Sequence, residues 1–204
     1  MELQPILARG FILAVSAPSG TGKTSLCDKL AQEDPDVVRS ISVTTRQQRV
    51  GEISGRDYHF VSVEQFKSME DRGELLETAQ VFGNWYGTPK RPVLDALSKG
   101  QVIVMDIDTV GALKIAGLYP QDTVLLYVYP PSLADLEKRL RARGKNSAED
   151  LKIRLQEAAS EIKESRKYHY GITNMDFDRA YLELKSVVSG ERLKLTRLAL
   201  PFLD

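Results

Sequence analysis

The sequence predicts an α/β fold, a parallel β-sheet flanked by helices, for a chain of 204 residues. Three continuous apolar runs of strand length, at 11–15, 102–107 and 123–129, indicate buried strands. Helix-like segments separate or follow these runs, and such alternation is typical of parallel sheets. The length suits one globular domain, so we expect residues 1–204 to form a single unit.

The helices are predicted in order along the chain. The first begins at Thr24 and ends near Glu33, because Pro35 disfavours a helical conformation in the residue before it. Serine side chains suit the N-cap position, since they accept hydrogen bonds from the first free backbone N–H groups. The candidate N-caps are Ser62, Ser132 and Ser147, and the later helices are predicted near 110–118, 132–143, 147–166 and 178–195.

A glycine-rich turn lies between the first strand and the first helix. Its sequence, SAPSGTGKTS at 16–25, has the strand–loop–helix context that a phosphate-binding P-loop requires, although Ala17 replaces the first glycine of the usual pattern. Lys23 would contact the β- and γ-phosphates and Thr24 would ligate Mg²⁺. An ordinary glycine-rich turn is the alternative. The candidate ATP-binding residues here are Ala17, Pro18, Ser19, Gly20, Thr21, Gly22, Lys23, Thr24 and Ser25.

Residues 40–88 interrupt the alternation of strands and helices. Short alternating segments and a Gly83-Asn84 turn predict an inserted α+β lobe. A polar stretch at 142–150 separates two predicted helices and suggests the tip of a mobile lid. The expected divisions are a core at about 9–39, 89–137 and 168–204, a lobe at about 40–88, and a short helical lid at about 138–167.

Charge and composition limit the function classes. The 28 Lys and Arg residues balance 28 Asp and Glu residues, so no overall field favours nucleic acid or an anionic membrane. Basic residues outnumber acidic ones between 137 and 154, which suggests a small polyanionic ligand. The single Cys27 fits a reducing compartment. With neither a signal peptide nor a transmembrane run recognised, we expect a cytoplasmic protein.

Seven motifs, in order, resemble those of the guanylate kinase family over about 11–184. They are SAPSGTGKT (16–24), SVTTRQQRVGE (42–52), GRDYHF (55–60), FGNWYGT (82–88), DID (106–108), PPS (130–132) and RLRARG (139–144). The resemblance implies a P-loop NTPase-type fold whose inserted lobe binds a nucleoside monophosphate. It also implies Mg²⁺-dependent transfer of a phosphoryl group from ATP to GMP or dGMP.

Residues of the lobe form the GMP site that this resemblance implies. Arg46 and Arg49, by their chemistry, could clamp a phosphate dianion, although solvated surface arginines are the alternative. Glu77 would face guanine, whose N1–H and 2-amino group are two adjacent donors for a carboxylate; an exposed strand glutamate is the ordinary alternative. The resemblance also implies hydroxyl contacts from Tyr58 and Tyr86 to phosphate, where core packing is the alternative, and from Ser42 and Thr88 to the O6/N7 edge of guanine.

Further charged residues follow the lobe. Asp106 ends an apolar run, where acidic residues of P-loop enzymes reach Mg²⁺, and Asp108 follows it. The resemblance places Asp106 and Asp108 near the metal and the acceptor and leaves open which residue serves which. Either residue could instead cap the next helix. The resemblance also places Arg139, Arg143 and Arg154 over the transferring phosphoryl group, where a solvated cationic face is the alternative, and Asn174 near adenine.

The predicted mechanism needs no general base, because the acceptor phosphate is mostly a dianion at neutral pH. The catalytic residues would be Lys23, Arg46, Arg139, Arg143 and Arg154, with Thr24 and Asp106 holding Mg²⁺ directly or through water. The expected partners are ATP and GMP, without nucleic acid, membrane or an obligate protein partner. Two rivals are a binding module for phosphorylated peptides and a kinase for another small phosphate. The presence of Gly20, Gly22, Lys23 and Thr24 argues against the first. Glu77, together with Ser42 and Thr88, argues against the second.

Overall fold

A central sheet of five parallel strands organises the computed structural model, which describes residues 9–81, 83–142 and 148–198. The strand order is β2 (Val37–Arg39), β7 (Val102–Asp106), β1 (Phe11–Ser16), β8 (Thr123–Tyr129), β9 (Tyr170–Thr173). The three apolar runs of the sequence are its three inner strands. The predicted α/β fold is confirmed.

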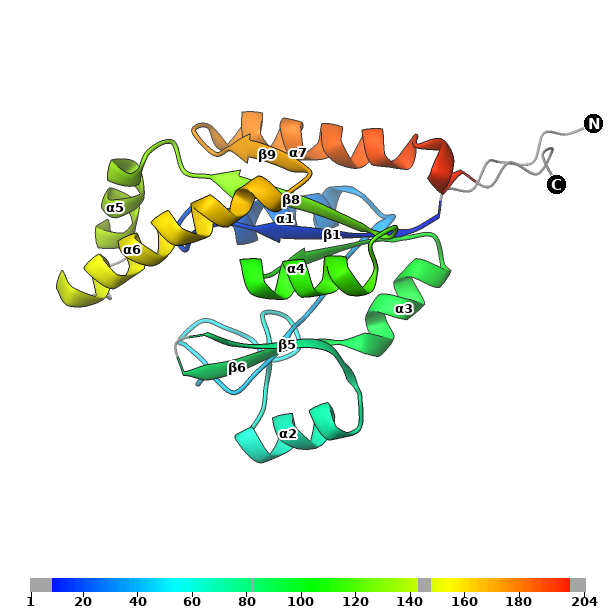
Figure 1. Ribbon diagram of the computed structural model, residues 1–204, viewed down its shortest axis with the longest axis horizontal. Helices are drawn as coiled ribbons and strands as arrows, with labels where there is room; N and C mark the ends of the chain where they lie inside the picture. Colours follow the sequence, from blue (N-terminus) through cyan, green and yellow to red (C-terminus); the bar gives the residue numbers. More distant parts are fainter. Residues whose placement is uncertain (1–8, 82, 143–147, 199–204) are drawn as a thin grey trace, which may run out of the picture.

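Helices cover both faces of this sheet (Figure 1). Alternate side chains of β1 point to opposite faces, as the pleat of a strand requires. Phe11, Leu13 and Val15 pack with α1 (Lys23–Glu33) and α7 (Phe177–Arg192). Ile12 and Ala14 pack on the other face with α3 (Lys90–Ser98) and α4 (Thr109–Leu118). Because β1 is buried on both faces, its sequence is continuously apolar rather than alternating.

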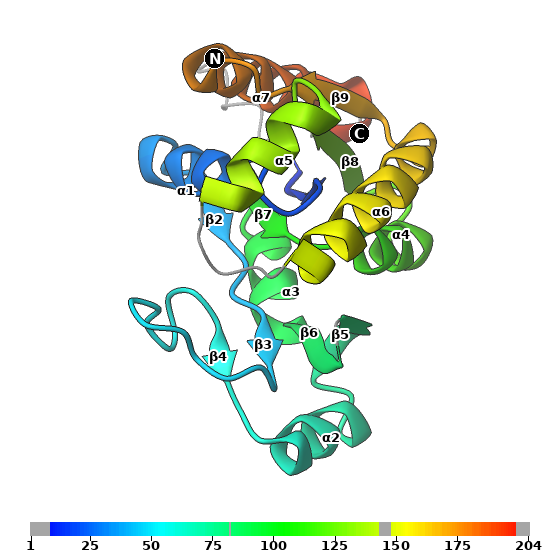
Figure 2. The same ribbon diagram turned by 90° about the vertical axis from the view of Figure 1, so that its left-hand side faces the viewer.

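A second sheet lies beside the first and is built from the segment that interrupts the sequence pattern (Figure 2). Its order is β4 (His59–Phe60), β3 (Val43–Thr44), β6 (Asn84–Pro89), β5 (Leu75–Val81). The hairpin of β5 and β6 pairs Val81 with Asn84, next to the predicted Gly83-Asn84 turn. The helix α2 (Val63–Asp71) begins at Ser62 with both hydrogen bonds of a capping box, as predicted.

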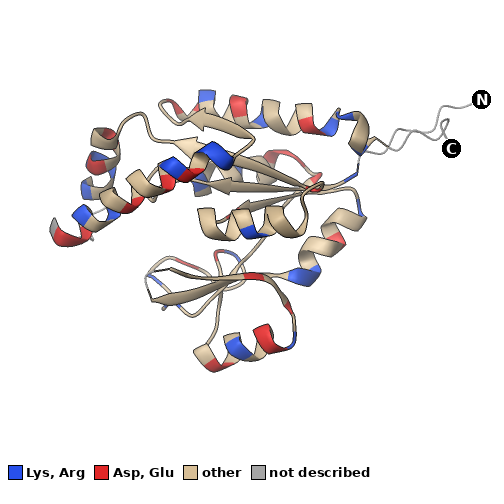
Figure 3. Cartoon of the chain, in the orientation of Figure 1, with Lys and Arg blue, Asp and Glu red and all other residues tan. Residues whose placement is uncertain are grey.

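Two further helices lie at the carboxyl end of the central strands (Figure 1). α5 (Leu133–Ala142) and α6 (Ala148–Glu164) pack through Leu136, Leu140 and Leu151. Ser132 caps α5, since its Oγ accepts from the Asp135 backbone N–H at 3.0 Å. The predicted cap at Ser147 lies outside the described residues. Both basic and acidic side chains occur along these helices and along α7 (Figure 3).

Three elements are absent from the sequence prediction: β2, β9 and α3. The two strands are only 3 and 4 residues long, too short for a periodic pattern. In β9, Gly171 weakens the strand signal, but a Cβ there would lie 2.8 Å from the Tyr129 ring. α3 begins Lys-Arg-Pro, and Pro92 suggests a turn, although proline is tolerated in the first helical turn. The predicted helix at 178–195 ends at Arg192 and is followed by a 3-10 turn, Leu195–Arg197.

Candidate active site

The glycine-rich loop joins β1 to α1 at the carboxyl edge of the sheet. Gly20 and Gly22 both have φ of 96°, a conformation that favours glycine. A Cβ on Gly22 would also lie 2.6 Å from the Asn174 side-chain nitrogen. The buried Thr21 hydroxyl donates to the Pro18 carbonyl at 2.8 Å, which closes the loop. The loop therefore has the backbone geometry that a phosphate site requires.

Lys23, Thr24 and Asp106 meet at this edge because β1 and β7 are adjacent, with Val15 paired to Asp106. The Lys23 ammonium lies 2.8 Å from Asp106 Oδ1 and donates to the Ile107 carbonyl at 2.8 Å. The Thr24 hydroxyl donates to Asp106 Oδ2 at 2.5 Å. Burial lowers the pKa of Lys23, but Asp106 outweighs it and the net shift is upward. Burial raises the pKa of Asp106, but Lys23 and Thr24 lower it by more, so the net shift is downward.

These oxygens suit a magnesium ion. A hydroxyl and a carboxylate are hard ligands, and Mg²⁺ in phosphoryl-transfer sites takes one or two protein oxygens and completes its shell with phosphates and water. No cluster of three or more His, Cys, Asp or Glu side chains able to hold a metal occurs within 9–81, 83–142 and 148–198. Thr24 and Asp106 thus fit a metal that is held largely by its nucleotide.

Residues from α5, α6 and the end of β9 surround the loop. Arg139 donates to the Thr21 carbonyl at 3.2 Å and to the Asn174 carbonyl at 3.0 Å. The buried Asn174 amide donates to the same Thr21 carbonyl at 2.7 Å. Arg154 reaches Ser19 Oγ at 3.4 Å. Asn174 thus braces the P-loop, a role that its spacing in the sequence does not indicate. Arg143, the remaining predicted arginine, lies outside the described residues.

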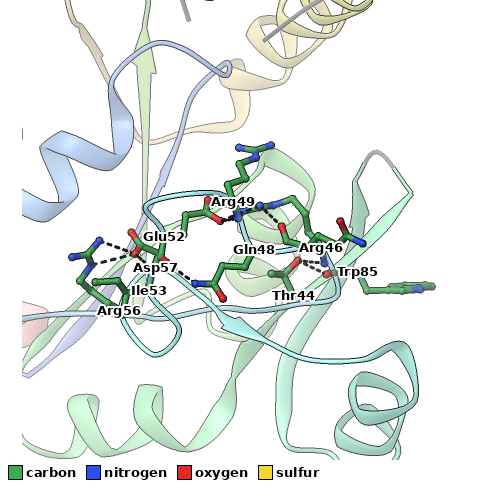
Figure 4. Close-up of polar contacts among 10 residues, drawn as sticks. Thr44, Arg46, Gln48, Arg49, Glu52, Ile53, Arg56, Asp57 and Trp85 are labelled. Carbon is green, nitrogen blue, oxygen red and sulfur yellow. Dashed lines mark hydrogen bonds and ion pairs between the residues drawn. The ribbon is translucent and has the colours of Figure 1, made fainter. Parts of the chain in front are cut away.

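In the second sheet, Arg46 is held by an acidic partner that the sequence motif alone does not indicate. Its guanidinium forms two bonds to the Glu52 carboxylate, at 2.8 and 3.1 Å (Figure 4). The guanidinium lies 5.3 Å from the centre of the Tyr58 ring. Tyr58 packs edge-on against Tyr86 at 6.0 Å. One arginine and two tyrosines of the predicted phosphate site are therefore neighbours.

Arg49 and Ser42 complete the described positions of this lobe. The backbone N–H of Arg49 donates to Glu52 Oε2 at 2.8 Å, and its side chain projects away from the loop (Figure 4). Glu52 therefore contacts both arginines of the pair. It could have been suspected as the acidic residue closing the Arg-rich motif. Ser42 is partly buried immediately before β3, and its carbonyl accepts from His59.

Glu77 is a buried carboxylate on β5, directly opposite Thr88 on β6. It is 8% exposed. The Thr88 hydroxyl donates to Glu77 Oε1 at 2.8 Å, whereas Oε2 is buried with no hydrogen-bond partner in the described part of the chain. Burial is the largest cause of a pKa raised to about 7, with Asp108 adding to it while Thr88 and Lys114 oppose it. An unpaired buried carboxylate oxygen is costly and calls for a partner that donates.

Asp108 serves as the N-cap of α4. Its Oδ1 accepts from the backbone N–H groups of Val110 and Gly111 at 2.8 and 2.9 Å. Capping was one of the two alternatives that spacing left open for the acidic pair. Asp106 has no such role, since its oxygens contact Lys23 and Thr24. The two carboxylates, although two residues apart, therefore have different surroundings.

The raised pKa of Glu77 predicts a pH-dependent stability. Because the folded pKa of about 7 exceeds the ordinary 4.5, the folded state holds this proton more tightly. Stability therefore falls as pH rises from about 4.5 to 7, by an amount on the order of 3 kcal/mol. Glu77→Gln should raise the melting temperature of the ligand-free protein at pH 8, and the gain should shrink toward pH 5. Scanning calorimetry with Glu74→Gln as an exposed control checks this, and a pH-independent difference contradicts it.

Comparison with known proteins places this geometry in a family. A family model described as guanylate kinase matches residues 9–191. The guanylate kinase of Maricaulis maris (strain MCS10) is 48% identical over 96% of this chain and 89% of its own length. That of Caulobacter vibrioides is 47% identical over 93% and 89%. A crystal structure of guanylate kinase from Anaplasma phagocytophilum aligns with a TM-score of 0.83 at 33% identity, covering 96% of this chain and 93% of that one. The chain therefore belongs to the guanylate kinase family of nucleoside monophosphate kinases, which phosphorylate GMP with ATP.

Proposed function

We propose that the two halves of the site described above bind ATP and GMP and carry out this transfer between them. The observation that carries the proposal is the unpaired Oε2 of Glu77. Guanine offers N1–H and the 2-amino group side by side, so it can donate to both oxygens of one carboxylate. Adenine would present an acceptor at N1 instead, and a buried polar site strongly rejects a ligand that leaves its groups unpaired. The Ser42 hydroxyl would donate to the O6/N7 edge, and Thr88 would do so by turning its single hydroxyl proton from Glu77 Oε1 to the base.

The phosphate of GMP would bind to the cationic part of the same lobe. Glu52 occupies one edge of the Arg46 guanidinium and fixes its orientation, so the remaining N–H groups would bind a phosphate dianion with a smaller loss of entropy. Tyr58 and Tyr86 would add hydroxyl donors, and Arg49 a second guanidinium. Asp108, on the core side, faces Glu77 closely enough to raise its pKa and would lie beside the bound base.

ATP would bind at the glycine-rich loop, 17–25, with Lys23 on its β- and γ-phosphates. Thr24 and Asp106 would hold Mg²⁺ with the triphosphate, directly or through water; when bound, the ion neutralises charge on the β- and γ-oxygens. Arg139 and Asn174, both bonded to the Thr21 carbonyl, hold the loop in shape. The adenine contact expected of Asn174 is part of this proposal.

In the transfer step the GMP phosphate is already a nucleophile, so the protein needs only to align two polyanions and stabilise the charge that spreads over the transferred group. Lys23, Arg46, Arg139, Arg143 and Arg154 would supply that charge. We infer that residues of about 40–88 form a GMP-binding lobe and about 138–167 a lid. Their closure would exclude water, which otherwise competes as an acceptor.

An assay of ADP release with Mg-ATP and GMP, AMP, CMP or UMP in parallel tests the proposal. Turnover with GMP alone is the expected result. Turnover with another acceptor would retain the P-loop argument and overturn the assignment of Glu77. Absence of turnover with every acceptor would favour a binding module.

No helix of the described residues is long and apolar enough to cross a membrane. For location and partners, we propose that the protein is a cytoplasmic enzyme that acts on small molecules.

A further inference from the structure

One face of α4 meets the strand that carries Glu77. Asp108, Gly111 and Lys114 follow one another at intervals of three residues, so each lies beside the next on the surface of the helix. A Cβ on Gly111 would lie 3.0 Å from Glu77 Oε2 and 2.7 Å from Ile107 Cδ1. A contact of 3.0 Å is tighter than ordinary van der Waals packing. Gly111 thus leaves the space that this carboxylate oxygen occupies.

Lys114 fixes the neighbouring backbone of the same strand. Its ammonium donates to the Thr78 carbonyl at 2.6 Å, one residue after Glu77. The positive charge of Lys114 lowers the pKa of Glu77, while the carboxylate of Asp108 raises it. Asp108 and Lys114 are the charged groups of α4 that act on Glu77, and Thr88 is its hydrogen-bond donor from β6. The helix α4 therefore limits the position of the Glu77 carboxylate and also supplies the charges around it.

We propose that Gly111 and Lys114 are positioning residues for guanine recognition: α4 sets the location of the Glu77 carboxylate and the charges that surround it. The proposal rests on the proposed function of Glu77 as the residue that reads the base. Gly111 lets the Glu77 carboxylate lie against the N-terminal turn of α4. Lys114 holds the backbone of β5 against the same helix. Displacements below 1 Å matter in such a site, because hydrogen bonds to a bound base weaken steeply when they lengthen or bend.

The first test compares two glycine-to-alanine changes in the same helix. Gly111→Ala is expected to raise KM for GMP about tenfold, with KM for ATP changed less than twofold, because the added methyl would press on the Ile107 side chain and on Glu77 Oε2, neither of which belongs to the P-loop. Gly117→Ala is the matched control, since nothing lies within 4 Å of a Cβ at that position. Equal KM values for GMP in the two variants would overturn the role of Gly111.

The second test uses an exposed residue, so that folding is not at risk. Lys114→Met should move the midpoint of the pH dependence of KM for GMP upward by several tenths of a pH unit, because Glu77 loses a nearby positive charge. Lys99→Met, at the exposed end of α3, makes the same charge change away from Glu77. GMP titrates identically in both assays, so the difference reports the protein. A midpoint equal to that of Lys99→Met would overturn the role of Lys114.

Glu77→Gln, measured in parallel, separates failure of this inference from failure of the proposed function. If Glu77→Gln impairs GMP use while Gly111→Ala and Lys114→Met behave as their controls, the base-reading role stands and the positioning role is wrong. If Glu77→Gln leaves GMP use unchanged, the base-reading role itself is wrong and the positioning role falls with it. The expected result is impaired GMP use in Glu77→Gln and Gly111→Ala and a shifted pH midpoint in Lys114→Met, with ATP binding intact in all three variants.

Discussion

Lys23→Met is expected to lower kcat by about 10³-fold or more while the dissociation constant for GMP changes less than threefold. Lys23 is a partly buried cation of the P-loop, and loss of one preorganised charge at a phosphoryl-transfer site removes stabilisation that is largest in the transition state. GMP would bind mainly to Arg46, Glu77 and their neighbours in the second sheet, which this change leaves intact. Steady-state kinetics and calorimetric titration with GMP measure the two quantities separately.

Lys29→Met is the control for this prediction. Lys29 lies on the same helix, and its ammonium is 3.2 Å from Asp178, away from the P-loop. Lys29→Met therefore removes the same charge as Lys23→Met but leaves the P-loop unchanged. It should retain turnover close to that of the unmodified protein. An equal loss of GMP affinity in Lys23→Met would contradict the separation of the two substrate sites.

Glu77→Gln is expected to lower kcat/KM for GMP at least about 100-fold with little change in KM for ATP. An amide presents one acceptor and one donor, so its NH₂ group would face a donor of guanine where the carboxylate has a free oxygen. The loss should also flatten the pH dependence of KM for GMP near pH 7, because the titrating group is gone. Kinetics with GMP at several pH values measure both effects.

Glu74→Gln provides the matched comparison, since Glu74 precedes the same strand, is exposed and pairs with Arg72 at 2.7 Å. It should leave kcat/KM for GMP unchanged. If Glu77→Gln also leaves it unchanged, Glu77 does not read the base, and the guanine assignment must rest on other residues. If Glu77→Gln is more stable at pH 8 but uses GMP poorly, the Glu77 carboxylate destabilises the free protein and is needed for its function.

Much of the site could be predicted because its chemistry lies in contiguous motifs. The P-loop needs consecutive residues between a strand and a helix, so Gly20, Gly22 and Lys23 are identifiable from spacing alone. The end of an apolar run locates Asp106 at the end of a strand, and Asp106 meets the P-loop because parallel strands share a carboxyl edge. Spacing does not separate Asp106 from Asp108, since both could reach that edge. The backbone turn after β7 gives them different surroundings, because it directs Asp108 into the N-cap of α4.

The sequence alone determined the apolar inner strands, the phosphate loop and the resemblance to a family, because these depend on local order and residue type. Only the tertiary structure decided which distant residues meet. Glu77 has Thr88 as its partner through the register of a hairpin, and its second oxygen is enclosed by Gly111 from a helix of the core. Asn174 reaches the Thr21 carbonyl across 153 positions of the chain. Such contacts depend on how sheets and helices pack, and packing is a property of the whole chain rather than of any segment.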